Sequence, residues 1–288
     1  MIKRYEEYIC LVNKRLEGKF SKTSVDIVEE AMKYSLFADG KRIRPLLCLE
    51  FSNICNGNIS DALDYSCAVE MVHTYSLIHD DLPCMDDDDM RRGKPSCHIK
   101  FGEEYALLAG DALLTYAFET VAKCNNDSNR NIKAVSALSK CAGYLGMIGG
   151  QTLDLQNENK ICDIDCVMKT DFLKTSKLIE AACVMGCISA NADEKQIESA
   201  IKYSGYMGIA FQICDDILDV TSTSEVLGKP VLSDNENDKS TYVSLLGIDK
   251  AKKMADEYTF KALECLDFFG EKANDLKVFT KDLIKRKK

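Results

Sequence analysis

The stretch DALDYSCAVEMVHTYSLIHDD, residues 61–81, decides the fold of this chain. It is apolar almost all round, which predicts a central helix that is buried on every side. The exceptions to this apolar pattern are regularly spaced along the helix. They are Glu70, His73, Ser76 or Leu77, and Asp80. Positions 73, 76 and 80 share one helical face. The sequence therefore predicts a buried helix with a single polar face.

The rest of the chain is predicted to be helical as well. The four prolines lie in short charged stretches, so the long runs between them contain no helix breaker. No run of alternating strands with hairpin turns, no βαβ rhythm and no repeat is present. We therefore expect an all-α protein with a single domain over residues 1–288. Helices are expected at roughly 2–17, 24–37, 43–56, 60–82, 101–123, 131–156, 163–173, 175–190, 194–220, 241–246, 249–268 and 271–285.

The composition excludes several classes of protein. Apolar residues make up 46% and charged residues 29% of the chain, which is typical of a globular protein. The net charge of -9 argues against nucleic-acid binding, and no run of 18 apolar residues predicts a membrane helix. The 14 cysteines lie mostly in apolar helical runs, which favours free core thiols over a metal or disulfide role. We expect a cytoplasmic protein that binds neither nucleic acid nor membrane.

The first acid cluster is HDDLPCMDDDDMRRG, residues 79–93. Asp80 and Asp86 are six residues apart, so they cannot share a face of one continuous helix. Pro83 disfavours helical geometry at the preceding residue, so the helix is predicted to end near Leu82. The chain should then turn and bring Asp86 back toward Asp80. The following acids, residues 87–89, are expected to be solvated.

The second acid cluster lies in YSGYMGIAFQICDDILDV, residues 203–220. Its polar residues Gln212, Asp215, Asp216 and Asp219 fall at helical positions 0, 3, 4 and 7 and form one stripe. Several buried carboxylates on one face are costly unless cations neutralise them. Oxygen ligands without histidine or cysteine favour Mg²⁺ or Ca²⁺. Basic residues near the two clusters could hold phosphate: Lys41, Arg44, Arg91, Arg92, Lys174, Lys229 and Lys239.

Each of these features has an ordinary structural explanation. A run of aspartates is usually a solvated loop, an Arg-Arg pair is usually surface charge, and a single buried His73 is usually a satisfied core residue. Two acid stripes on the two most apolar helices, with prolines and basic residues beside them, favour a functional site instead. The residues alone indicate divalent cations and a ligand with several phosphates.

Seven motifs in order give this chain a specific resemblance. They are GKRIRP (40–45), DDLPCMD (80–86), RRGKP (91–95), GGQTLDL (149–155), KTSKLIEAA (174–182), FQICDDILD (211–219) and GKPVLSDNENDKSTY (228–242). With these motifs the chain resembles the trans-isoprenyl diphosphate synthases, and among them the bacterial farnesyl diphosphate synthases, over nearly its whole length. The resemblance implies the isoprenoid synthase fold, with antiparallel helices around a deep central cavity, and a homodimer.

The resemblance also implies roles for the site residues. Asp80 and Asp86, with Asp81 beside them, would bind two Mg²⁺ ions, and Asp215, supported by Asp216 and Asp219, would bind a third; Mn²⁺ could substitute. The ions, Arg91, Lys174 and Lys229 would hold the allylic substrate, dimethylallyl or geranyl diphosphate. Isopentenyl diphosphate would lie on Lys41, Arg44, His73 and Arg92. Thr175 and Gln212 would stabilise the allylic cation, and the loop carrying Lys239 would close over the site.

Product length should depend on the floor of the cavity. Helix geometry places Tyr75 and Ser76 roughly 6–8 Å below Asp80, and farnesyl synthases of this kind have an aromatic residue at the position of Tyr75. A bulky ring there should stop the product at C15, whereas a small residue would leave room for C20. A geranylgeranyl diphosphate synthase is the alternative, followed by a non-catalytic regulatory subunit. A terpene cyclase is disfavoured because its second motif would differ from DDILD.

Overall fold

The computed structural model describes residues 2–20, 27–158, 160–221 and 240–284. Within these ranges every regular element is a helix apart from one short hairpin, which confirms the predicted all-α fold. The elements are α1 (Lys3–Glu17), α2 (Ile27–Leu36), α3 (Ile43–Ile54), α4 (Ile59–Asp80), β1 (Met90–Arg91), β2 (Lys94–Pro95), α5 (Cys97–Phe101), α6 (Glu103–Ala122), α7 (Ser128–Ala142), α8 (Met147–Asn157), α9 (Ile164–Asp171), the π-helix η1 (Phe172–Ser176), α10 (Lys177–Ser189), α11 (Glu194–Thr221), α14 (Tyr242–Leu246), α15 (Ile248–Asp267), the 3₁₀ turn η2 (Gly270–Ala273) and α16 (Asn274–Ile284).

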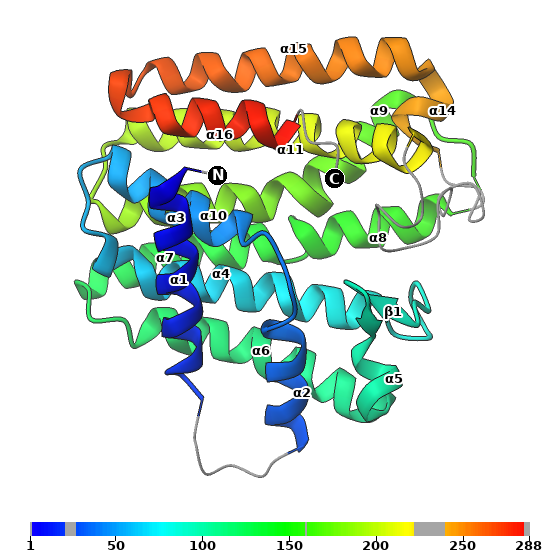
Figure 1. Cartoon of the computed structure of the whole chain (residues 1–288), viewed down its shortest axis with the longest axis horizontal. Coiled ribbons are helices and arrows are strands. Elements are labelled where there is room, and N and C mark those ends of the chain that lie inside the picture. Colours follow the sequence, from blue (N-terminus) through cyan, green and yellow to red (C-terminus); the bar gives the residue numbers. More distant parts are fainter. Residues whose placement is uncertain (1, 21–26, 159, 222–239, 285–288) are drawn as a thin grey trace.

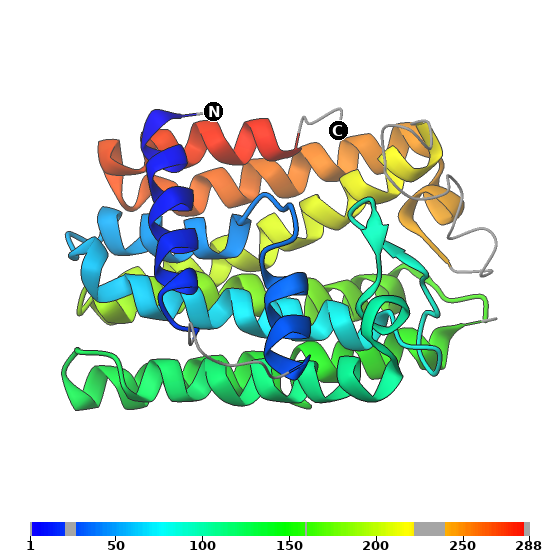
Figure 2. The same cartoon turned by 60° about the horizontal axis from the view of Figure 1, so that its bottom comes forward.

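Helix α4 lies at the centre of the molecule, as its sequence predicts. It packs against α3, α6 and α10, and most of its side chains are buried. Asn58 caps its first turn by accepting a hydrogen bond from the backbone N–H of Ser60. Figures 1 and 2 show the long helices α15, α11, α10, α4 and α6 running side by side, with α1 and α2 crossing them. This arrangement leaves the C-terminal end of α4 beside the β1–β2 hairpin.

The prediction of one continuous helix over 131–156 is wrong, because the chain forms two helices there. Helix α7 ends at Ala142 and α8 begins at Met147. At Gly146 the backbone leaves helical geometry, and an added Cβ would lie 2.0 Å from the carbonyl oxygen of Cys141. Residue 146 therefore has to be glycine, and the break lets α8 take its own direction toward the cavity described below.

The predicted break between residues 173 and 175 is also wrong. The backbone stays helical from α9 through η1 into α10, with one π-helical turn at Phe172–Ser176. Single π-turns of this kind are frequent at functional sites. The turn changes the direction of Lys174 and Thr175 without ending the helix.

Two small elements were not predicted. Strands β1 and β2 pair as an antiparallel hairpin whose turn is Arg92-Gly93, and both turn residues have positive φ. Strands of two residues are too short to show alternation in a sequence. Helix α5 precedes α6, which starts at Glu103, two residues later than expected.

Other predictions can be placed directly. All fourteen cysteines carry free thiols; nine of them are buried, as expected for core thiols, whereas Cys10 and Cys84 are exposed. No helix in the described ranges is long and apolar enough to cross a membrane. The long loop predicted at 221–240, which contains Lys229 and Lys239, lies almost wholly outside the described residues.

A buried ion pair ties α4 to the segment before α3. The guanidinium of Arg42 donates from Nη1 to Oε1 of Glu70 at 2.6 Å and from Nη2 to the carbonyl of Leu36 at 2.6 Å. Both charged side chains are almost completely buried. Arg42 also has a positive φ of 49°, so the backbone accepts strain to make these contacts. This pair fixes the position of GKRIRP relative to α4.

We expect Arg42→Met to lower the free energy of unfolding by about 3–5 kcal/mol, because Glu70 would be left as an unpaired buried charge. Urea unfolding of the purified protein measures this. The control is Lys202→Met, which breaks the exposed Lys202–Glu198 pair and should have little effect. Equal urea midpoints for Arg42→Met and wild type would contradict the prediction.

Candidate active site

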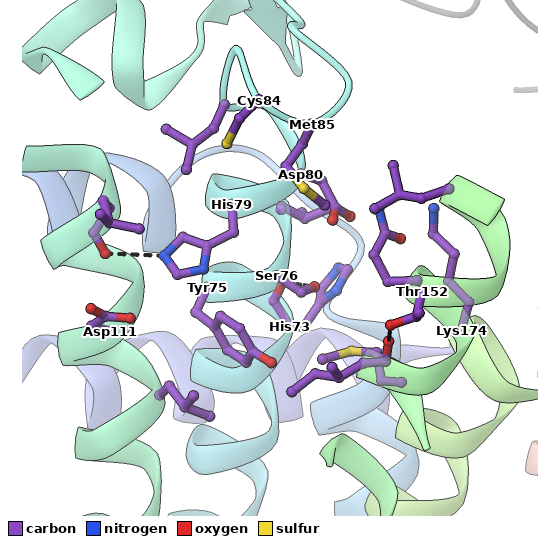
Figure 3. A pocket seen from close by; sticks show the side chains of 18 of the residues that line it. His73, Tyr75, Ser76, His79, Asp80, Cys84, Met85, Asp111, Thr152 and Lys174 are labelled. Carbon is purple, nitrogen blue, oxygen red and sulfur yellow. Dashed lines mark hydrogen bonds between the residues drawn. The ribbon is translucent and has the colours of Figure 1, made fainter. Parts of the chain in front are cut away.

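A cavity of about 550 Å³ lies between α4, α6, α8 and η1. Its volume is within the usual range for small-molecule sites. Figure 3 shows Asp80 at one side, with Lys174 on the facing helix and Tyr75 deeper along α4. The lining residues are mostly apolar away from these charges, among them Leu77, Leu107, Leu114, Met147, Ile148 and Leu155. The cavity therefore has a charged part and an apolar part.

The turn after α4 brings the first acid cluster together as predicted. Helix α4 ends at Asp80, and the backbone N–H of Asp86 donates to the carbonyl of Asp80 at 2.9 Å. The N–H groups of Met85 and Asp87 donate to the carbonyl of Leu82. Residues 87–89 are exposed, again as expected. Asp86 thus lies beside Asp80, although six residues separate them.

The carboxyl group of Asp80 lies in an unfavourable environment. The pKa of Asp80 is raised to about 6: burial is the largest cause, Lys174 and Arg91 oppose the shift, and the nearby charges of Asp86 and Asp81 add to it. A buried carboxylate with acidic neighbours is stabilised by a cation. The site is therefore ready to accept positive charge at Asp80.

Asp81 points away from this position. Its buried carboxylate accepts hydrogen bonds from the guanidinium of Arg91, with Nε at 2.8 Å. Arg91 also forms an ion pair with Asp88 at 3.1 Å. Asp81 therefore holds the β1–β2 hairpin against the end of α4, and Arg91 is only partly exposed at the site.

A group of basic side chains surrounds His73, which lines the same cavity as Asp80. Arg44 Nη1 donates to Nε2 of His73 at 3.3 Å, and both residues line the cavity. Burial, then the charges of Arg44 and Arg92, lower the pKa of His73 well below its usual value. Burial also lowers the pKa of Arg44 to about 10, with Arg92 adding to the shift. Cations this close to one another repel, so the group favours an anion.

The turn of the hairpin places Arg92 in this group. An added Cβ at Gly40 would lie 2.7 Å from Nη1 of Arg92, so the guanidinium packs directly on the backbone of Gly40. Lys41 follows in the chain and is exposed. The structure thus brings together the predicted residues Arg44, His73 and Arg92, with Lys41 at the neighbouring surface.

The π-turn η1 supplies Lys174 and Thr175. Both line the cavity, and Thr175 is buried. Lys174 Nζ donates to Asp154 of α8 at 2.7 Å. Gly150 of α8 permits this arrangement, since a Cβ there would lie 2.1 Å from the backbone nitrogen of Lys174. Lys174 therefore lies between Asp154 and the charged part of the cavity.

The second acid stripe lies on α11, as predicted. Asp215, Asp216 and Gln212 are partly buried, and Asp219 is buried. Oδ2 of Asp216 accepts a hydrogen bond from the backbone N–H of Tyr242 at 2.8 Å, so this carboxylate also anchors the start of α14. None of these four is among the residues that line the cavity.

Sequence reasoning missed several cavity residues. Gln151 and Asp111 line it, His79 contacts both α6 and Tyr75, and Asp154 holds Lys174. Gln151 and Asp154 lie inside the motif GGQTLDL, but no role was derived for them. His79 and Asp111 give no signal by spacing, because they come to line one cavity only through the packing of α4 on α6.

The donor set suits Mg²⁺, although the described carboxylates do not form a complete metal site. No group of three or more histidine, cysteine, aspartate or glutamate side chains converges at metal distance within the described residues. Mg²⁺ typically takes one or two carboxylates and completes its shell with water and substrate phosphates. Asp80 and Asp86 fit such a shared site, because burial at Asp80 calls for a cation and both side chains offer only hard oxygen ligands.

Comparison with known proteins agrees with this geometry. The polyprenyl synthetase family model matches residues 25–267. A chloroplastic geranylgeranyl pyrophosphate synthase of Catharanthus roseus is 45% identical over 92% of this chain and 75% of its own length. Farnesyl diphosphate synthase of Bacillus subtilis is 45% identical over 82% of this chain and 81% of its own length. The crystal structure of an FPP/GFPP synthase from Zymomonas mobilis has a TM-score of 0.87 at 32% identity and covers 98% of this chain and 97% of its own.

The chain belongs to the polyprenyl synthetase family. It is a prenyltransferase that elongates prenyl diphosphates, a reaction for which the family typically uses Mg²⁺. Relatives named for two product lengths are equally similar to it, so the comparisons leave the product length open.

The raised pKa of Asp80 predicts how stability depends on pH in the metal-free protein. The folded value of about 6 exceeds the value of 3.8 for a free side chain, so the folded state favours the protonated carboxyl. The stability that this proton contributes is complete below about pH 4 and is lost as the pH rises through about 6. The free energy of unfolding of Asp80→Asn should therefore be up to about 3 kcal/mol higher than that of wild type at pH 8 in EDTA.

Urea unfolding at pH 8 and pH 5 measures the effect, and the gain should shrink at the lower pH. The matched control is Asp87→Asn in the same acid cluster, where the exposed side chain should give no gain at either pH. An Asp80→Asn protein less stable than wild type at pH 8 would refute the electrostatic account.

Proposed function

We propose that this protein condenses isopentenyl diphosphate with dimethylallyl and then geranyl diphosphate to give (2E,6E)-farnesyl diphosphate and pyrophosphate. The observation that carries the proposal is the cavity, with Asp80 and Lys174 at its charged part and the buried ring of Tyr75 in its apolar part. A diphosphate needs the first part, and a prenyl chain of limited length needs the second.

The two substrates would occupy the two charged regions. The allylic diphosphate would lie near Asp80, Asp86 and Lys174, with Asp215 of α11 opposite and Lys229 contributing from the chain beyond the described residues. Isopentenyl diphosphate would lie on Arg44, His73 and Arg92, where neighbouring cations already favour an anion. Neutral His73, whose Nε2 accepts from Arg44, would then donate from Nδ1 to the diphosphate without adding charge.

The chemistry follows from this placement. The C–O bond of the allylic substrate breaks with both electrons going to pyrophosphate, and the C3–C4 double bond of isopentenyl diphosphate attacks the allylic cation. A proton then passes to pyrophosphate. Bound Mg²⁺, three ions in this proposal with Mn²⁺ as a substitute, would neutralise the charge on the departing pyrophosphate. Thr175 and Gln212 would stabilise the cation with their oxygens, and the apolar walls would exclude water.

Tyr75 supports the C15 product over C20. Its ring is 5% exposed and lines the cavity about one and a half turns below Asp80, beside Ser76. A prenyl chain that enters from the charged part would meet this ring. A C20 product is the second candidate, because a relative of equal similarity carries that name.

The homodimer implied by the family resemblance also stays a proposal. Large apolar side chains outside the cavity are exposed on and near α6 and α7, namely Leu108, Ile132, Tyr144 and Leu145. Monomeric proteins rarely expose many such side chains together, so this region is the proposed contact face for a second copy.

Product analysis tests the proposed function. Purified protein with Mg²⁺, dimethylallyl diphosphate and isopentenyl diphosphate should give farnesol after dephosphorylation. Tyr75→Ala should shift most of the product to geranylgeraniol, because the cavity loses the ring that ends it. The control is Tyr75→Phe, which should still give C15 since the hydroxyl has no hydrogen-bond partner in the described structure. Geranylgeraniol from wild type would support the C20 alternative. The absence of any condensation product would refute the proposal.

The isopentenyl site gives a separate prediction. Arg44→Met should raise KM for isopentenyl diphosphate at least about tenfold, because one charge-assisted hydrogen bond contributes about 1.5–3 kcal/mol. KM for the allylic substrate should change much less. Steady-state kinetics with each substrate varied measures both. Lys123→Met, which removes an exposed cation paired with Glu119, is the control and should leave both constants unchanged; equal effects of Arg44→Met on both substrates would contradict the assignment.

A further inference from the structure

His79 is the residue before Asp80, and nothing above assigns it a role in the reaction. Its Nε2 lies 3.0 Å from the backbone carbonyl oxygen of Leu107 in α6. Because a carbonyl oxygen can only accept, Nε2 carries the proton of this hydrogen bond. Figure 3 shows the imidazole between α4 and α6, above Tyr75 and near Asp111. His79 therefore fastens the end of α4 to the wall of the cavity.

The same imidazole contacts the ring of Tyr75. The two rings meet edge to face, with centroids 5.7 Å apart and planes at 81°. The hydroxyl of Tyr75 is buried and has no hydrogen-bond partner among the described residues. The orientation of the Tyr75 ring therefore depends on packing, and His79 is one of the groups that supply it.

Gly110 makes room for this arrangement. An added Cβ at residue 110 would lie 2.1 Å from Nε2 and 2.4 Å from Cδ2 of His79. Glycine inside a helix costs about 1 kcal/mol relative to alanine, and Gly110 is a buried position within α6. The space that it leaves is filled by the imidazole, so alanine there would force the ring of His79 away from the carbonyl of Leu107.

We propose that His79, hydrogen-bonded to Leu107 and accommodated by Gly110, is a positioning residue that fixes the ring of Tyr75 and thereby sets product length. The inference rests on the proposed function, in which Tyr75 ends the cavity. It makes the contact between His79 and Leu107, which are 28 residues apart in the chain, a second determinant of product length. The competing role is purely local: His79 could position only Asp80, and would then affect rate and not product length.

The test compares the ratio of the next longer product to the wild-type product. His79→Ala, His79→Gln and Gly110→Ala should each raise this ratio at least about tenfold, a discrimination that pocket shape can supply. His79→Gln keeps a donor for the Leu107 carbonyl and lacks the ring, so it provides a variant with less risk of misfolding. The matched control is Gly205→Ala in α11, where a Cβ would meet one ring atom of Phe172 at 3.2 Å; its ratio should equal that of wild type.

A double variant separates positioning from an independent effect. In the Tyr75→Ala background, His79→Ala should change the ratio less than about twofold, because the ring that it positions is gone. The proposal is overturned if the single variants lose rate with an unchanged product ratio. It is equally overturned if the effects of His79→Ala and Tyr75→Ala multiply.

A binding measurement keeps this test distinct from that of the proposed function. Calorimetry would give the affinities of the unreactive thiolodiphosphate analogues of farnesyl and geranylgeranyl diphosphate. His79→Gln and Gly110→Ala should raise the relative affinity for the geranylgeranyl analogue, and an unchanged affinity ratio refutes the role of His79. Absence of turnover in wild type would refute the proposed function alone, because the binding ratio would still report on the end of the cavity.

Discussion

The hydrogen bond from the backbone N–H of Asp86 to the carbonyl of Asp80 is the interaction on which the site depends. Carbonyl groups in the last turn of a helix lack intrahelical donors and carry the negative end of the helix dipole. Aspartates added there increase the repulsion. The turn holds them with backbone hydrogen bonds, which leaves the carboxylates of Asp80 and Asp86 for other partners. Arg91 and Lys174 offset part of the negative charge, and the remainder favours added cations.

Much of this site could be predicted because it follows from periodicity along single helices. The apolar length of residues 61–81 gave the central helix, and Pro83 gave the turn that returns Asp86 to Asp80. The positions of Arg44, His73 and Arg92 near one another were expected from family resemblance, and the structure brings them together. In the first two cases the chemistry of a few neighbouring residues determines the local geometry, whereas the group of Arg44, His73 and Arg92 joins three separate elements.

The features that could not be predicted depend on contacts between helices. Gly146 ends a helical pattern because of its distance from the carbonyl of Cys141, and no periodicity shows that distance. The π-turn at Phe172–Ser176 keeps a helix continuous where spacing suggested a break. Asp154 meets Lys174 only because α8 packs closely on η1 at Gly150. At such positions two backbones approach each other closely, and a single sequence indicates these approaches only indirectly.

The two parts of the cavity impose different demands on the sequence. The charged part must satisfy fixed electrostatics, so its residues form recognisable motifs. The apolar part needs only shape, which many combinations of side chains can provide. Relatives named for C15 and C20 products are each 45% identical to this chain, so overall similarity does not carry the length. In the proposal made above, a difference of one isoprene unit depends on whether the ring of Tyr75 is held in place, and a ring without a hydrogen bond is held by its neighbours. In that proposal the determinants of product length extend to residues, such as Gly110, that position the ring without lining the cavity themselves.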